Sequence, residues 1–144
     1  MFSFLPQPMK GSIILILVIL NTSFWLPFMV IGALIKIIIP LPVVKRWVSK
    51  TLISAASCWV SLNSFFMFLF LKIEWVVSDI EDLSKDDWYF VNCNHQSWSD
   101  IPVVQKILNR KVPMLKFFLK KDLIWVPFLG ICWWALDFPF MKRS

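Results

Sequence analysis

The segment VNCNHQSWSD, residues 91–100, contains the only histidine of the chain, His95, and an aspartate five positions later, Asp100. An imidazole that contacts a carboxylate can act as a general base, because the carboxylate fixes the ring tautomer and stabilises the imidazolium. A single histidine beside an apolar segment is more often a structural hydrogen-bonding residue. The elements around the pair have to decide between these two interpretations.

His95 and Asp100 can pair only if they do not share one continuous helix. Within a helix, five residues at about 100° each would leave the two side chains about 140° apart. A loop that leaves a strand and enters a helix could instead fold back and bring the carboxylate to the imidazole. We therefore predict a strand at residues 88–92, His95 on a loop, a helix that starts near Pro102, and an imidazole–carboxylate dyad.

The hydroxyl that such a dyad would activate is expected to belong to the substrate. The sequence has no G-x-S-x-G segment, which favours direct transfer to the substrate hydroxyl over a mechanism with a serine nucleophile. Ser97 and Ser99 are expected to cap or brace the turn. With a single histidine, we expect no metal site. The three cysteines, Cys58, Cys93 and Cys132, show no paired spacing and are expected to be reduced, mostly buried thiols.

The amino-acid composition indicates more hydrophobic side chains than a protein core can bury, so a membrane has to cover the rest. Of 144 residues 58% are hydrophobic, with nine Trp and fourteen Phe, which is more than a soluble domain of this size can bury. Residues 11–35 and 51–71 carry no charge, and each segment could cross about 30 Å of hydrocarbon. We predict two membrane helices in an anchoring region at residues 1–72. A signal peptide is the weaker alternative, because the first segment is too long and lacks a small-residue cleavage site.

Both apolar segments have irregular features. Asn21, Thr22, Ser23 and Pro27 are expected to break or kink the first helix. In the second segment, serines at helical spacing are expected to pack against the first helix, at positions Ser54, Ser57, Ser61 and Ser64.

The membrane topology stays open on the sequence alone. The segment that connects the two apolar runs contains Lys45, Arg46 and Lys50. The positive-inside tendency would keep this segment in the cytoplasm. In a hairpin that crosses the membrane twice, residues 73–144 would then lie on the opposite side. Either the second segment lies partly in the interface, or the hairpin enters only one leaflet, or the tendency fails here.

Residues 73–144 read as a second, α/β region. Runs rich in β-branched and aromatic residues predict strands at 73–80, 87–94, 111–118 and 137–143. Helices are predicted at 100–110 and at 120–136, with a break from Pro127 to Gly130. Strands that alternate with helices predict the α/β class.

Asn94, His95 and Asp100 form an N-H-x4-D pattern that resembles the first block of the glycerolipid acyltransferase family, typified by bacterial 1-acyl-glycerol-3-phosphate acyltransferase. Hydrophobic helices before this block are also similar to that family. Residues 123–143, LIWVPFLGICWWALDFPFMKR, resemble the branch that contains YihG and the lysocardiolipin acyltransferases. The resemblance covers most of the chain and implies a glycerolipid-acyltransferase-type α/β domain at 73–144.

This resemblance implies transfer of a fatty acyl group from acyl-CoA or acyl carrier protein to the hydroxyl of a lysophospholipid, without a further cofactor. His95 would be the general base and Asp100 its orienting partner. The second family block, G-x-x-F-x-x-R, matches Phe140 and Arg143 but has Asp137 at its glycine position. Arg143 would hold the acceptor phosphate, with Phe140 and Asn94 also in the substrate site; without the resemblance Arg143 would read as a surface arginine.

Two further blocks of the family would lie beyond residue 144. The α/β domain is therefore expected to be incomplete, and the chain to be an N-terminal part with little activity of its own. The alternative hypothesis is a non-catalytic membrane protein that retains part of an acyltransferase.

Basic and aromatic residues after the dyad predict a surface for anionic lipid headgroups rather than nucleic acid. They are Lys106, Arg110, Lys111, Lys116, Phe117, Phe118, Lys120, Lys121, Trp125 and Phe128. For Lys106, Arg110 and Lys111 an ordinary solvated face is an equally good interpretation. The expected partners are a phospholipid membrane, the lysophospholipid and the acyl thioester, and the expected location is the bacterial inner membrane with the catalytic part in the cytoplasm.

Overall fold

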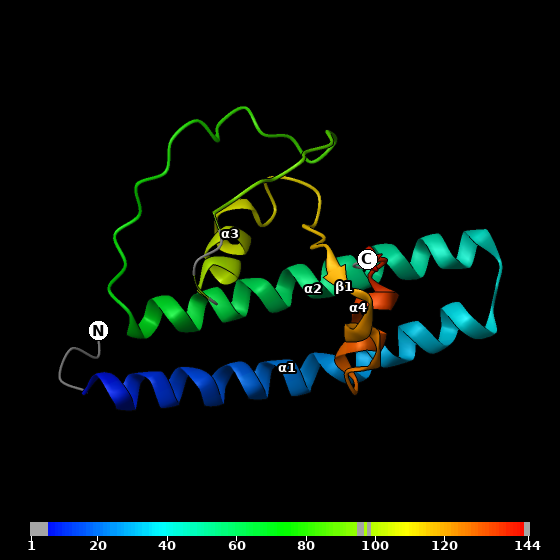
Figure 1. Cartoon of the computed structure of the whole chain (residues 1–144), viewed down its shortest axis with the longest axis horizontal. Coiled ribbons are helices and arrows are strands. Elements are labelled where there is room, and N and C mark those ends of the chain that lie inside the picture. The colour runs from blue at the N-terminus through cyan, green and yellow to red at the C-terminus, as the bar shows by residue number, and fades with distance from the viewer. Residues whose placement is uncertain (1–5, 95–96, 98, 143–144) are drawn as a thin grey trace. The chain divides into compact units, whose positions relative to one another are not determined.

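The computed structural model of the chain describes residues 6–94, 97 and 99–142. Two long helices come first, and short elements follow them after an irregular stretch (Figure 1). The elements in chain order are α1 (Gln7–Ile38), α2 (Pro42–Phe70), α3 (Asp100–Leu108), β1 (Leu119–Lys120), the 3₁₀ helix η1 (Lys121–Trp125), α4 (Leu129–Ala135) and β2 (Phe140–Met141).

The chain divides into two compact units, and each unit contains part of both long helices. The first unit is Met1–Asn21 with Ser57–Leu115, and the second is Thr22–Ala56 with Lys116–Ser144. Each unit is described by itself below. The predicted domain boundary at residue 72 stays a prediction.

Helix α1 is continuous, so the prediction that Asn21–Ser23 and Pro27 break the helix is wrong. Proline at position 27 removes only the backbone bond to the carbonyl four residues earlier, and the remaining bonds of a 32-residue helix persist. The helix ends at Ile38 because Ile39 precedes Pro40, and a residue before proline avoids the helical region. Pro42 then starts α2, where its missing N–H costs nothing.

In the first unit, polar side chains join the helices. Asn21 donates from Nδ2 to the Asn63 Oδ1 at 2.8 Å and to the Trp59 carbonyl at 3.1 Å. Asn109, which caps the C-terminus of α3, donates from Nδ2 to the Ser61 Oγ at 2.9 Å and the Ser57 carbonyl at 3.2 Å. Ser57 and Ser61 therefore contact the end of α3, rather than only packing against the first helix as predicted.

In the second unit, small residues let α1 and α2 approach closely. A side-chain carbon added to Gly32 would lie 2.6 Å from the Leu52 Cδ2, so the leucine occupies the space that glycine leaves free. Met29, Ala33 and Ala56 are buried in the same unit. Close approach at small residues is the usual packing of helices that lack a hydrophobic driving force between them.

Residues 71–94 contain no helix or strand, so the two strands predicted at 73–80 and 87–94 are wrong. A strand needs a neighbour for its backbone groups, and the side chains here face solvent instead: Val76 is 99% exposed, Trp88 95% and Phe90 82%. High β propensity did not suffice without a partner strand. Turns at 81–82 and 85–86 fit the acidic, polar composition.

Strands β1 and β2 pair in parallel, with Leu119 opposite Phe140 and Lys120 opposite Met141, and η1 and α4 connect them. The predicted strand at 137–143 is confirmed in its centre, whereas the one at 111–118 is wrong because β1 begins at Leu119. The predicted helix at 100–110 is confirmed by α3. The predicted break from Pro127 to Gly130 is confirmed only in its first part, because α4 begins at Leu129. Glycine is required at position 130 in the first turn of α4, since a side chain there would collide with the Ile124 carbonyl.

The described part of the chain is mostly helical with a small parallel sheet, so the α/β class is present only in this strand–helix–strand unit. Both α1 and α2 are long and apolar enough to cross a membrane. In their apolar 18-residue stretches only 11% and 22% is buried, whereas the core helix of a soluble protein would be mostly buried. The long helices therefore suggest membrane association.

Candidate active site

A tight turn leads into α3 and holds Asp100. The Asp100 Oδ2 accepts a hydrogen bond from the Ser97 backbone N–H at 2.7 Å, and the Asp100 N–H donates to the Ser97 carbonyl at 3.1 Å. The Ser99 N–H donates to the Ser97 Oγ at 3.0 Å. Ser97 therefore braces the turn as predicted, while Ser99 precedes the helix without a side-chain cap bond.

Asp100 is the first residue of α3, as the predicted helix start required. Of the other two residues in the N-H-x4-D pattern, the structure describes only Asn94. Asn94 is exposed on irregular backbone, without the predicted strand at 88–92 before it. His95 lies outside the described residues, so the His95–Asp100 contact stays a prediction.

The second block lies in the other compact unit, where Phe140 is half-buried in β2 and pairs with Leu119 of β1. Arg143, three positions later, lies outside the described residues. Asp137, at the position where the family pattern has glycine, has a backbone φ of 59°. This left-handed region is the one that glycine adopts freely and that aspartate tolerates better than most residues.

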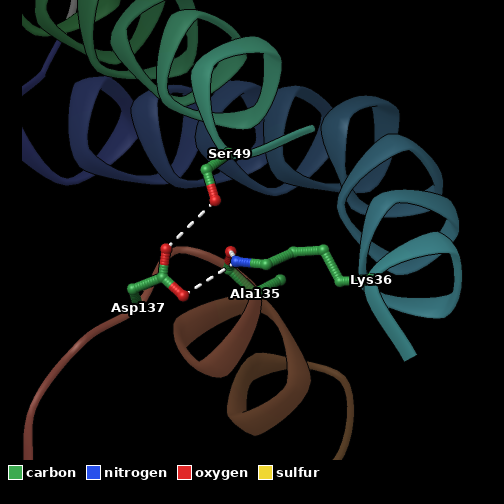
Figure 2. Close-up of polar contacts among 4 residues, drawn as sticks. All are labelled: Lys36, Ser49, Ala135 and Asp137. Carbon is green, nitrogen blue, oxygen red and sulfur yellow. Dashed lines mark hydrogen bonds and ion pairs between the residues drawn. The ribbon is translucent and has the colours of Figure 1, made fainter. Parts of the chain in front are cut away.

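A buried lysine contacts this aspartate, and sequence reasoning missed it. Lys36 in the last turn of α1 is only 6% exposed, and its Nζ lies 2.8 Å from both the Asp137 Oδ1 and the Ala135 carbonyl oxygen. The Ser49 Oγ donates to the Asp137 Oδ2 at 3.2 Å (Figure 2). The signal in the sequence was a lone charge at the end of a long apolar run.

The cysteines are free thiols in different environments. Cys93 is exposed, Cys58 is half-buried and Cys132 is buried. Burial raises the pKa of the Cys132 thiol above its ordinary value, because desolvation disfavours the thiolate. Over the described residues, no group of three or more His, Cys, Asp or Glu could hold a metal ion.

The predicted lipid-facing residues are only partly engaged with the protein. Lys106 lies over the Phe68 ring at 4.8 Å, and Lys120 pairs with Asp122 at 2.7 Å. Exposed aromatic side chains in the same stretch are Phe118 at 63%, Trp125 at 85% and Phe128 at 65%. Lysines beside exposed aromatic rings are typical of a membrane–water interface.

Comparison with known proteins indicates the class of protein to which this site is similar. Residues 74–144 match the family model described as Acyltransferase, so this part of the chain is similar to acyltransferase domains. Together with the N-H-x4-D pattern inside the matched segment, the match supports the glycerolipid acyltransferase family. No curated protein and no solved structure was found to match the chain.

Proposed function

We propose that the chain belongs to a membrane-bound glycerolipid acyltransferase that moves a fatty acyl group from acyl-CoA or acyl carrier protein to the hydroxyl of a lysophospholipid. The acceptor class is that of 1-acyl-glycerol-3-phosphate, and the branch is that of YihG and the lysocardiolipin acyltransferases. The observation that carries the proposal is the family match at residues 74–144, which includes His95 and Asp100.

In this reaction His95 takes the proton of the acceptor hydroxyl while that oxygen attacks the carbonyl carbon of the thioester. The tetrahedral intermediate collapses, the carbon–sulfur bond breaks, and the departing thiolate receives the proton from the imidazolium. Asp100 orients the imidazole and stabilises its charge. The hydrogen bond from the Ser97 N–H supports this role, because it fixes the orientation of the Asp100 carboxylate.

The acceptor is bound by the second block. A guanidinium matches a phosphate with two parallel donors, so we assign the headgroup to Arg143, and we assign Phe140 and Asn94 to substrate binding. The two apolar helices keep the protein at the bilayer that contains the acceptor, which we assign to the bacterial inner membrane with the site on the cytoplasmic side. Their length, composition and low burial support this attachment.

The test uses the complete natural protein that contains this chain, supplied in membranes with 1-acyl-glycerol-3-phosphate and labelled acyl-CoA or acyl carrier protein. His95→Ala should lower kcat by about 10² to 10⁴, the usual contribution of a general base. Asp100→Asn should also be severely impaired, since an orienting carboxylate is worth up to ~10⁴ in a serine protease triad. Arg143→Ala should mainly raise KM for the acceptor.

Asp82→Asn is the matched control, because this exposed aspartate lies in a turn of the irregular stretch. Its rate should equal that of the wild type. Unchanged turnover in His95→Ala would remove the base assignment. If the wild-type protein transfers no acyl group to any lysophospholipid, the proposed function fails, and the alternative of a non-catalytic membrane protein is favoured.

A further inference from the structure

Asp137 occupies a backbone conformation that its side chain has to stabilise. Its φ of 59° lies in the left-handed region, which is costly for residues with a side chain and free for glycine. The residue lies two positions after the end of α4 and three positions before the start of β2. The direction in which the chain enters β2 is therefore set at this turn.

Both carboxylate oxygens of Asp137 have partners from the long helices. Oδ1 lies 2.8 Å from the Lys36 Nζ of α1, and Oδ2 accepts from the Ser49 hydroxyl of α2 at 3.2 Å (Figure 2). Lys36 also donates to the Ala135 carbonyl at 2.8 Å, and its ammonium lies 5.8 Å from the centre of the Trp134 ring. The ammonium thereby satisfies a carbonyl at the C-terminus of α4, where carbonyls lack helical partners.

This arrangement explains how a lysine is tolerated at 6% exposure on an apolar helix. An isolated buried ammonium is strongly unfavourable, whereas one that is paired and hydrogen-bonded is not. Because these contacts already occupy the Lys36 ammonium, it is not free to bind a phosphate group. A positioning role fits the geometry better than direct binding.

The turn leads directly into the sheet. The Asp137 and Phe138 N–H groups donate to the Trp134 and Trp133 carbonyls, both at 3.0 Å. The Pro139 carbonyl then accepts from the Leu119 N–H at 3.0 Å, and Phe140 pairs with Leu119. A displaced turn would move β2 and the segment that follows it.

We propose that Lys36, Ser49 and Asp137 form a polar clamp that fixes the turn between α4 and β2, and that the clamp positions Phe140 of β2 for binding of the acceptor. The second half of this inference rests on the proposed function. Lys36 and Asp137 are positioning residues, and neither takes part in the chemical step. The membrane hairpin thus contributes to acceptor recognition as well as to attachment.

The first measurement is amide hydrogen exchange of residues 136–141 in the detergent-solubilised protein, and it does not depend on activity. Lys36→Met and Asp137→Asn should each speed exchange by about tenfold or more, since each leaves a polar partner unpaired. In the double variant the two effects should be clearly less than multiplicative, and Lys36→Arg should retain most of the protection. The matched control is the exposed pair Lys120–Asp122 of the same unit, whose side chains are 60% and 73% exposed, where Lys120→Met and Asp122→Asn should combine multiplicatively.

Asp137→Gly separates the clamp from the backbone conformation. Glycine removes the strain of the positive φ but also the carboxylate, so exchange should still become faster. Slower exchange in this variant, or exchange within twofold of wild type in both Lys36→Met and Asp137→Asn, would overturn the clamp. Should Lys36→Met fail to fold, Asp137→Asn and Ser49→Ala give the same comparison.

The second measurement is the kinetics of the complete natural protein. Lys36→Met should raise KM for the lysophospholipid by about tenfold, with little change in kcat or in KM for the thioester, as expected when only acceptor binding is lost. Faster exchange with an unchanged acceptor KM would overturn the positioning role. If the wild type transfers no acyl group, the proposed function fails, and the exchange data alone decide whether the clamp exists.

Discussion

Asp100 and Asp137 are both aspartates at the boundary of a helix, and their surroundings differ. Asp100 begins α3, where negative charge is favoured by the helix dipole, and its Oδ2 accepts from the Ser97 N–H. Asp137 follows α4 with a positive φ and is paired with a buried lysine. Asp100 is the proposed orienting partner of the base, whereas Asp137 is part of the proposed clamp on the turn before β2.

A residue-scale prediction concerns the thiols. At pH 7 to 8, maleimide should label exposed Cys93 quickly and Cys132 slowly, because burial raises the pKa of Cys132 and the reactive thiolate is scarce below that pKa. Labelling of Cys132 should keep increasing as the pH rises past the ordinary thiol range. Mass spectrometry of the labelled protein measures both rates. In denaturant the two should become equal, and equal rates in the native protein would contradict the burial.

At the scale of elements, α3 is held at its C-terminal end. Asn109 bonds to Ser57 and Ser61 of α2, and the Arg110 Nη2 lies 3.7 Å from the Cys58 sulfur. Arg110 takes the positive φ, 64°, that commonly ends a helix. These contacts connect α2 to the helix that begins with Asp100. Ser57 and Ser61 of α2 therefore hold the helix that carries one residue of the candidate site.

Asn109→Ala should weaken this docking by about 1 kcal/mol, the usual net value of such hydrogen bonds, because it removes both bonds to α2. Hydrogen exchange of residues 100–108 should become faster, with exchange in the second unit unchanged. Gln105→Ala on the same helix leaves the Asn109 contacts intact and should behave as wild type. An Asn109→Ala protein with normal protection of α3 would show that other contacts hold the helix.

At the scale of the whole molecule, the two compact units each combine part of the helical hairpin with part of the acyltransferase-type segment. In the first unit α3 bonds to α2, and in the second the turn after α4 bonds to Lys36 and Ser49. Neither half of residues 74–144 is packed without the long helices. Removal of the hairpin should therefore disturb the fold of both units as well as membrane attachment.

The chain should fractionate with membranes and resist extraction by high salt or alkaline carbonate. Two helices of 32 and 29 residues with such low burial expose far more apolar surface than a purely electrostatic attachment requires. Detergent should release the protein. Immunoblots of the salt, carbonate and detergent fractions measure this, and release by salt or carbonate would contradict the two apolar anchors.

The amino-acid sequence by itself determined the features that depend on local composition and spacing. The two long helices follow from uncharged apolar runs, the start of α3 from Asp100 and Pro102, and the break between η1 and α4 from Pro127. The N-H-x4-D pattern indicated the family that the match at 74–144 supports. The His95–Asp100 contact itself remains a prediction from that pattern.

Only the tertiary structure decided features that depend on partners distant in sequence. Residues 73–80 and 87–94 have strand propensity, but a strand forms only where a neighbour accepts its backbone bonds, and none of them is in a strand. Lys36 and Asp137 are 101 positions apart, so no local pattern could pair them. Burial of the ammonium required a counter-charge, and folding brought Asp137 to it, at the position where the family pattern has glycine.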